Sequence, residues 1–137
     1  MRIIDANILL RYVLCDHEEL SAKAKQIIEE NVVEVPIEVL CEVVYVLLHV
    51  YKVERTEISQ ELQGFFKNTA CILPRRSAVI SGLDIFAKTN LDFVDCILAG
   101  YNSTEEAEID TFDRKLLKML GFEQLIYNLF FPTEERR

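Results

Sequence analysis

The sequence lacks several features that would direct it to a membrane or to an oxidising compartment. None of its 137 positions belongs to an apolar run of about 18 residues, which excludes a predicted transmembrane helix. The first predicted strand starts at residue 2, so we expect no room for a signal peptide. The cysteines are far apart and form no CxxC pair, which favours reduced core residues over disulfides or zinc ligands. We therefore expect a cytoplasmic protein with four free thiols, at Cys15, Cys41, Cys71 and Cys96.

Positive charge is also scarce. The chain has 15 lysines and arginines against 23 aspartates and glutamates, a formal net charge of −8. Because phosphate contacts need Lys and Arg, this balance argues against a broad nucleic-acid-coating surface. A local basic groove, an acidic face that meets a basic partner and an acid cluster that holds a divalent cation all remain compatible with it.

Strand-like and helical patterns alternate along the chain. Apolar periodicity predicts helices from about Asn7 and over 20–30, 37–51, 57–67, 77–88, 93–101 and 112–120. Short β-branched or apolar runs predict strands at 3–4, 32–35, 71–73, 107–111 and 125–127. No hairpin signal separates them, so the pattern indicates an α/β protein with a largely parallel sheet covered on both faces. We expect one domain over 1–132 and a charged tail over 133–137.

Two acidic residues stand out in the first half of the chain. Asp5 directly follows the first strand, where open α/β sheets place their ligands, although it can equally cap the next helix. Glu42 lies in the apolar stretch 39–51 (VLCEVVYVLLHVY), which predicts a helix buried nearly all round. A buried carboxylate must be protonated, paired or bound to a cation, unless nearby backbone N–H groups at the helix start stabilise it. Glu38, one turn earlier, fits that last role better.

Two further acidic pairs lie in the second half. Asp92 and Asp95 have the spacing of a capping box, and Asp95 in the first helical turn can also point toward the sheet edge. Asp110 and Asp113 follow the fourth predicted strand, and either can cap the next helix. Each acid thus has a structural explanation of its own. Only their joint placement, at what we expect to be one edge of the sheet, indicates a shared site.

Four segments together resemble the motif set of PIN-domain ribonucleases: IIDANILLRY at 3–12, EVLCEVVYVL at 38–47, LDFVDCILAGY at 91–101 and IDTFDRKL at 109–116. The resemblance is closest to the VapC-type toxins of type II toxin–antitoxin pairs. It implies a three-layer α/β/α sandwich with a mostly parallel, about five-stranded sheet. It also implies an Mg²⁺- or Mn²⁺-dependent ribonuclease that dimerises with a second copy and is blocked by a small antitoxin.

The same resemblance assigns roles to individual residues. It makes Asp5, Glu42, Asp95 and Asp113 the acidic quartet that binds Mg²⁺ or Mn²⁺. It also gives supporting roles to three residues. Asn7 and Thr111 match residues that orient waters or carboxylates, and Asp92 matches a secondary acid. Asp110 departs from the pattern, since this place is more often apolar or neutral in the family, and it leaves open whether Asp110 adds to the acidic pocket or caps the helix.

The chemistry of such a quartet explains its need for metal. Two carboxylates about 5 Å apart repel by roughly 3 kcal/mol at an effective dielectric near 20. A hard divalent cation removes this repulsion, lowers the pKa of a bound water and stabilises charge on a phosphodiester. We therefore expect metal-assisted hydrolysis of RNA, with no histidine required.

Negatively charged RNA needs positively charged side chains nearby in order to approach these acids. Arg114 and Lys115 are nearest to them in sequence, and Arg11 is a further candidate, while the alternative for each is an ordinary surface charge. We favour that alternative for Arg75 and Arg76. Replacing phosphate-contacting cations lowers the salt dependence of binding.

Three other functions compete with this one. A catalytically silent PIN-like module would bind RNA or a protein partner without cleaving anything. A nuclease acting on DNA would use the same metal chemistry. A phosphoaspartate enzyme is disfavoured, because Asn7 stands where a phosphatase of that type needs a second aspartate, and 71–74 offers no aspartate to a receiver domain.

Overall fold

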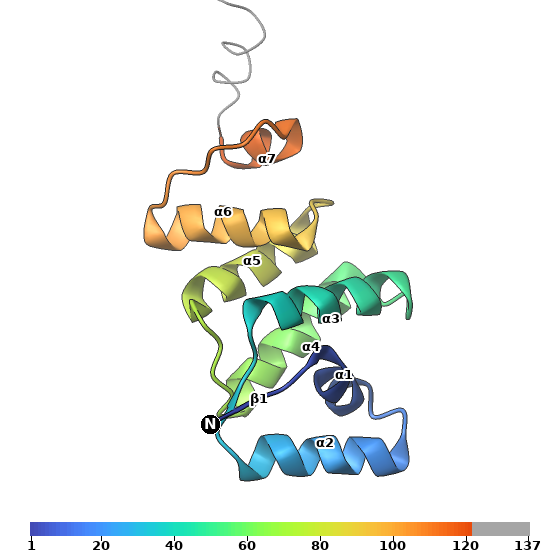
Figure 1. The fold of residues 1–137 in the computed structure, drawn as a ribbon. Helices are drawn as coiled ribbons and strands as arrows, with labels where there is room; N and C mark the ends of the chain where they lie inside the picture. The colour runs from blue at the N-terminus through green and yellow to red at the C-terminus, as the bar shows by residue number, and fades with distance from the viewer. Residues whose placement is uncertain (122–137) are drawn as a thin grey trace, which may run out of the picture.

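The computed structural model describes residues 1–121, and Figure 1 shows their arrangement. In chain order the elements are β1 (Arg2–Ile3), α1 (Ala6–Leu14), α2 (Glu18–Glu30), β2 (Val33–Glu34), α3 (Ile37–His49), α4 (Arg55–Asn68), α5 (Arg76–Lys88), α6 (Phe93–Glu105) and α7 (Arg114–Met119). Every helix that the periodicity predicts is present. Helix α5 begins one residue before the predicted start at 77, and its N-cap residue is Arg75.

The sheet is much smaller than expected. β1 and β2 pair in parallel, with Arg2 opposite Val33. Of the predicted third strand, a single parallel bridge remains, in which the Ile72 N–H donates to the Val33 carbonyl at 2.8 Å and the Ile72 carbonyl accepts from Val35 at 2.9 Å. The described residues therefore confirm parallel strands linked by helices, but not a sheet of about five strands.

The predicted fourth strand at 107–111 is wrong. Helix α6 continues to Glu105, four residues beyond the predicted end, and closes at Glu106, whose φ of 56° is left-handed. The Ala107 N–H then donates to the Tyr101 carbonyl, and its own carbonyl accepts from the Asn102 amide. Because the N–H and the carbonyl of Ala107 both bond to the end of α6, they cannot pair with a neighbouring strand. The fifth predicted strand, at 125–127, and the tail 133–137 lie outside the described residues.

The helices stack in successive pairs from α1 and α2 through α3 and α4 to α5 and α6, with α7 against α6 (Figure 1). One continuous hydrophobic core joins them, and its largest fully buried side chains include Leu9, Leu40, Leu47, Phe66, Leu83 and Phe86. Helices α5 and α6 approach each other closely at Gly100, where a Cβ would lie 2.1 Å from the Ala78 carbonyl oxygen. A glycine at this position lets the two helices touch.

The predicted all-round burial of the third helix is wrong. Helix α3 buries Leu40, Val43, Val44 and Leu47 against the core. Its other side is exposed and carries Glu38, Glu42, Tyr45 and His49, at spacings of four, three and four residues. Helix α3 packs against α1, α4 and α6.

The cysteines are all free thiols, as predicted. Cys71 and Cys96 are buried and Cys41 is half-buried, whereas Cys15 is exposed. The expectation of four core cysteines is therefore wrong for Cys15, which ends α1 in a left-handed conformation with φ of 50°. Within residues 1–121, no helix has the length and apolar character needed to cross a membrane.

Candidate active site

Asp5 lies at the start of α1, immediately after β1. Its carboxylate accepts a hydrogen bond from the Ile8 N–H at 3.0 Å, so it is the N-cap of this helix. The capping role, one of the two predicted alternatives, is thus confirmed, and it occupies one carboxylate oxygen. Asn7 follows on the first turn and is exposed. Asp5 also lines a hollow, whose other walls are Arg2, Ile3, Ile4, Ile8 and Ile27.

Glu42 lies on the exposed side of α3. Its charge is therefore solvated, and the argument that burial forces it to bind a base or a cation does not apply. Figure 1 shows α3 between α1, which carries Asp5 at its start, and α6, which carries Asp95. Neither Asp5 nor Glu42 is among the residues that line the hollow beside Asp95.

Asp95 is half-buried in the first turn of α6. Partial burial raises its pKa above the ordinary value, and the negative charges of Asp113 and Asp92 raise it further. Asp92 is the N-cap residue of this helix, but its side chain makes no capping hydrogen bond, so the predicted capping box does not form. The carboxylate of Asp92 is instead exposed beside Asp95.

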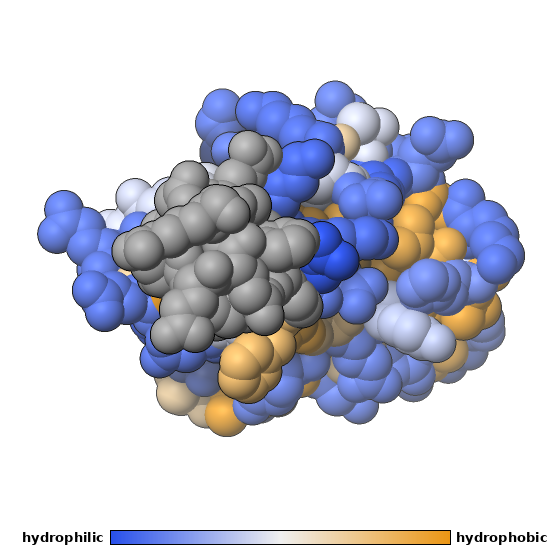
Figure 2. Space-filling model, turned by 90° about the horizontal axis from the view of Figure 1, so that it is seen from above, coloured by the Kyte–Doolittle hydropathy of each residue, from blue (hydrophilic) through white to orange (hydrophobic). Residues whose placement is uncertain are grey.

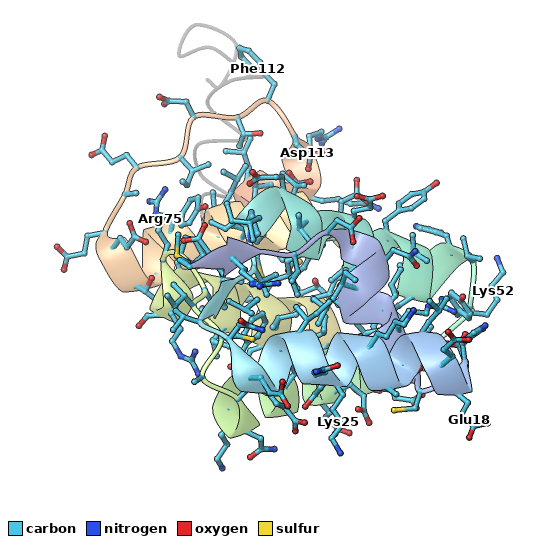
Figure 3. The ribbon with its side chains drawn as sticks, turned by 60° about the horizontal axis from the view of Figure 1, so that its bottom comes forward. Glu18, Lys25, Lys52, Arg75, Phe112 and Asp113 are labelled. Atoms are coloured by element: carbon cyan, nitrogen blue, oxygen red, sulfur yellow. The ribbon has the colours of Figure 1, made fainter. Side chains whose placement is uncertain are left out.

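Asp113 is fixed at the start of α7. Its Oδ1 accepts from the Leu116 N–H at 2.8 Å, and its own N–H donates to the Thr111 hydroxyl oxygen at 3.0 Å. Thr111 therefore holds the backbone that presents Asp113. Asp110 is exposed and does not cap α7. Figure 3 shows Asp113 beside α7 and Phe112 projecting away from the body of the protein.

Asp92, Asp95 and Asp113 meet at a cavity of about 430 Å³, which we call the acidic hollow. Its walls include Asp92, Asp95, Phe112, Asp113, Arg114 and Lys115. Figure 2 views the molecule from the side of α7, and most of the described surface visible there is hydrophilic. Three of the predicted acids thus share one hollow, whereas Asp5 and Glu42 do not line it.

The chemistry of the acidic hollow fits a hard divalent cation. Carboxylate oxygens are the ligands that Mg²⁺ and Mn²⁺ prefer. Partial burial and then the charges of Asp113 and Asp92 raise the pKa of Asp95, and a cation would remove the repulsion between these charges. In the described part of the chain, no three acidic, histidine or cysteine side chains are close enough to hold a metal ion together. Mg²⁺ commonly uses only one or two carboxylates and completes its shell with water and substrate phosphate. Asp95 and Asp113 match that smaller requirement.

The predicted cations divide into two groups. Arg114 and Lys115 line the acidic hollow. Arg11 instead pairs with Asp16 at 2.9 Å and donates to the Tyr51 hydroxyl at 3.0 Å, away from the hollow. Arg75 pairs with Glu105 at 2.6 Å, as expected of a surface charge.

Arg55 is a residue that the sequence did not reveal. Its Nε donates to the Phe86 carbonyl at 2.9 Å, its Nη2 donates to the Leu91 carbonyl, and its guanidinium lies 3.8 Å from the centre of the Phe86 ring. Burial lowers its pKa. These contacts fix the segment between α5 and α6, and so they position Asp92 and Asp95. Arg55 lies among other charged residues in the sequence, so no motif marks it.

The comparisons with known proteins give one family. The model of the PIN domain matches residues 2–121. Comparisons with curated proteins and with solved structures give no match. PIN domains are generally nucleases, have an α/β fold and typically use divalent metal ions. Because the match spans most of the chain, and because the acids of α6 and α7 meet at one hollow within it, this protein belongs to the PIN-domain family.

Proposed function

We propose that this chain is an Mg²⁺- or Mn²⁺-dependent endoribonuclease, the toxin of a cytoplasmic toxin–antitoxin pair. One observation carries the proposal: in a chain of a nuclease family, Asp95 and Asp113 converge on a hollow although 17 sequence positions separate them. Lys115 lines the same hollow and is suited to contact phosphate. Acidic and basic groups at one place are what phosphodiester hydrolysis requires.

In this proposal Asp95 and Asp113 hold the cation, with Asp92 in a secondary role. When bound, the cation supplies an activated water and stabilises charge on the phosphate. The helix start of α7 holds Asp113 through one carboxylate oxygen, which leaves the other for the ligand. The cation would balance the negative charge of Asp95, which Asp113 otherwise repels. Thr111 positions the backbone of Asp113, and Arg114 with Lys115 orients the RNA.

Asp5 and Glu42 remain predicted members of the quartet. Their positions supply a direct test, because the acidic hollow contains neither of them. If RNA cleavage needs the whole quartet, Asp5→Asn and Glu42→Gln should lose as much activity as Asp95→Asn. If the acidic hollow suffices, the two variants should keep activity near the wild-type rate.

The central experiment is cleavage of a mixed-sequence RNA with Mg²⁺, with Mn²⁺ and with a chelator. We expect cleavage only with metal, and a fall of at least about 100-fold in Asp95→Asn and Asp113→Asn. Asparagine caps a helix as well as aspartate does, so Asp113→Asn should keep α7 intact. The matched control is Asp84→Asn, an exposed acid of α5 outside the hollow, which should cleave normally. Metal-independent cleavage, or equal rates in all three variants, would contradict the proposal.

A second candidate is a catalytically silent PIN-like module. It is favoured by the lack of any metal-binding group of three side chains within residues 1–121. Such a module would bind RNA without shortening it, in the presence or absence of metal.

The same assay with single-stranded DNA separates ribonuclease from deoxyribonuclease activity.

The toxin role predicts three further results. Expression of the chain in bacteria should arrest growth, whereas expression of Asp95→Asn should not. Light scattering should give the mass of a dimer, and co-expression with the gene of its small antitoxin partner should restore growth. Growth arrest by Asp95→Asn would separate toxicity from the proposed cleavage.

A further inference from the structure

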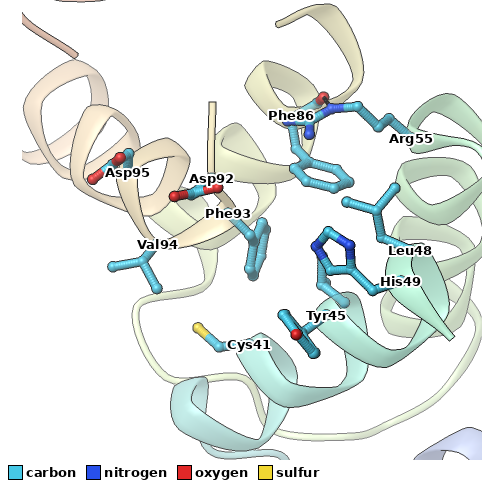
Figure 4. A pocket seen from close by; sticks show the side chains of 11 residues that line it. Cys41, Tyr45, Leu48, His49, Arg55, Phe86, Asp92, Phe93, Val94 and Asp95 are labelled. Carbon is cyan, nitrogen blue, oxygen red and sulfur yellow. Dashed lines mark hydrogen bonds between the residues drawn. The ribbon is translucent and has the colours of Figure 1, made fainter. Parts of the chain in front are cut away.

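A second cavity, of about 330 Å³, lies next to the acidic hollow. We call it the aromatic cavity. Its walls include Tyr45 and His49 of α3, Phe86 of α5, and Asp92, Phe93 and Val94 at the start of α6. Figure 4 shows rings from these three helices around one opening. The core does not need this opening, and neither does the proposed cleavage.

The rim and the floor of the aromatic cavity differ. Phe86 and Phe93 form a buried floor, with ring centres 5.6 Å apart and an interplanar angle of 84°. Tyr45 is 62% exposed on the rim, and its ring centre lies 4.5 Å from that of His49. Across the opening, Val94 is 55% exposed. A flat ring entering here would meet aromatic and aliphatic surface on several sides.

The two cavities share a wall. Asp92 and Asp95 line both of them. A ligand that fills the aromatic cavity therefore lies directly beside the carboxylates proposed to act on phosphate. A nucleotide joins a flat apolar ring to a phosphate group through one sugar, so its parts match the order of the two cavities.

The lining selects against other ligands. A phosphate in the aromatic cavity would face the carboxylates of Asp92 and Asp95, and the guanidinium of Arg55 is already bound to two carbonyl groups. A protein partner needs about 800 Å² of contact surface, and the cavity is at the lower limit of small-ligand pockets, about 300 Å³. Size and charge thus favour a small, neutral, flat ligand.

We propose that the aromatic cavity binds one nucleobase of the RNA, next to the phosphodiester at the acidic hollow. The inference rests on the proposed function, because it names a base-binding subsite for that substrate. Single-stranded RNA is recognised by stacking of splayed bases on Tyr, Phe and His side chains. Tyr45 and His49 are the stacking surface, and Phe93 is the floor.

Asp92 gives the subsite a preference among bases. Its carboxylate lies on the cavity wall, makes no capping hydrogen bond and accepts hydrogen bonds only. Adenine, cytosine and guanine carry an exocyclic amino group that donates to such an acceptor. The N–H that uracil offers, at N3, lies between two carbonyl oxygens, which a carboxylate repels. The cavity therefore favours the three amino-bearing bases over uracil.

The experiment follows the two histidines of the chain by proton NMR. His49 lines the cavity, whereas His17 caps α2 by accepting from the Leu20 N–H, and it serves as an internal reference. We titrate the full chain in chelator with AMP, UMP and ribose 5-phosphate. AMP should displace the His49 signal saturably through its ring current and leave His17 unchanged. UMP should bind more weakly, and ribose 5-phosphate should have no effect on His49.

Variants of the exposed Tyr45 test the stacking without disturbing the core. Tyr45→Ala should weaken AMP binding about 5- to 150-fold, which corresponds to the usual strength of base stacking on an aromatic ring. Tyr45→Phe keeps the ring and should bind as the wild type does. Asp92→Asn should bring AMP and UMP closer in affinity, and equal affinities in the wild type would overturn the preference.

Three results would overturn the subsite itself. These are an unmoved His49 signal with AMP, an equal displacement by ribose 5-phosphate, or a signal that moves with protein concentration alone, which would make this face an interface between two copies. Because binding is measured without metal, the two proposals fail separately. Metal-dependent cleavage with an unmoved His49 rejects only the subsite, and a displaced His49 without cleavage rejects only the nuclease.

Discussion

Replacing Gly100 by alanine should destabilise the protein, although alanine is the better helix former. The new Cβ would lie 2.1 Å from the Ala78 carbonyl oxygen and 3.2 Å from the Gly82 nitrogen, all of them backbone positions. Real Cβ atoms essentially never come within 3.0 Å of such a neighbour, so α5 and α6 must separate by about 0.9 Å, the difference from 2.1 Å. No side-chain rotation can relieve a contact between two helix backbones.

The size of the effect follows from two opposing contributions. Overpacking typically costs about 1–3 kcal/mol, and a rigid backbone clash belongs at the upper end of that range. Replacing glycine by alanine in a helix stabilises the folded state by about 1 kcal/mol. We therefore expect Gly100→Ala to lose about 2 kcal/mol of unfolding free energy. Gly64→Ala in α4, where a Cβ meets nothing within 4 Å, should gain about 1 kcal/mol.

Urea unfolding of both variants measures this difference of about 3 kcal/mol, which corresponds to roughly 10 °C in Tm. Gly64→Ala is the matched control because it makes the same chemical change without a neighbour. The shift of α6 also moves Asp95, so RNA cleavage by folded Gly100→Ala should fall more than stability alone requires. If Gly100→Ala is as stable as Gly64→Ala, the close packing of α5 on α6 described above is incorrect.

Three further predictions test the site and its support. Asp95→Asn should be more stable than the wild type at pH 7, because the raised pKa of Asp95 means that its charged form is disfavoured in the folded state. The wild type loses stability as the pH rises through the folded pKa of Asp95 and regains it on acidification, so the advantage of Asp95→Asn should vanish below about pH 4. A difference in Tm that does not change with pH would contradict this prediction. Arg55→Met should lower the unfolding free energy by about 3 kcal/mol, since it leaves the Phe86 and Leu91 carbonyls without their charged donor. An unchanged midpoint in urea unfolding would refute this prediction. Replacing Arg114 and Lys115 together by alanine should reduce the slope of log K against log salt for single-stranded RNA by about 1.4, and an unchanged slope would remove both from the RNA path.

The helices were predictable because their signals are local. Each helix bonds its own backbone four residues away, so the apolar period alone locates α2, α3 and α5. The caps were predictable for the same reason, since Asp5 and Asp113 each bond a backbone N–H three residues later. Local chemistry was read correctly at Asp5 and Asp113, but not at Asp92, where the predicted capping box does not form.

The strands were predicted less well because their partners are distant in sequence. The pattern at 107–111 is compatible with a strand, but the end of α6 occupies the backbone of Ala107 first. Likewise, the apolar run around Glu42 predicts burial, yet only the packing of neighbours decides which side of α3 is covered. Glu42 lies on the side that none of them covers.

The sequence by itself determined the succession of helices, the helix-capping aspartates and the PIN-domain motifs, because all of these depend on residues close together along the chain. Only the tertiary structure decided that Asp95 and Asp113 line one hollow, which Asp5 and Glu42 do not line. It also decided that Arg55 holds the segment before α6. The physical reason is that charges interact through space. The shift in the pKa of Asp95 depends on burial and on the charges of Asp113 and Asp92, of which Asp113 is brought near by the fold and not by the sequence.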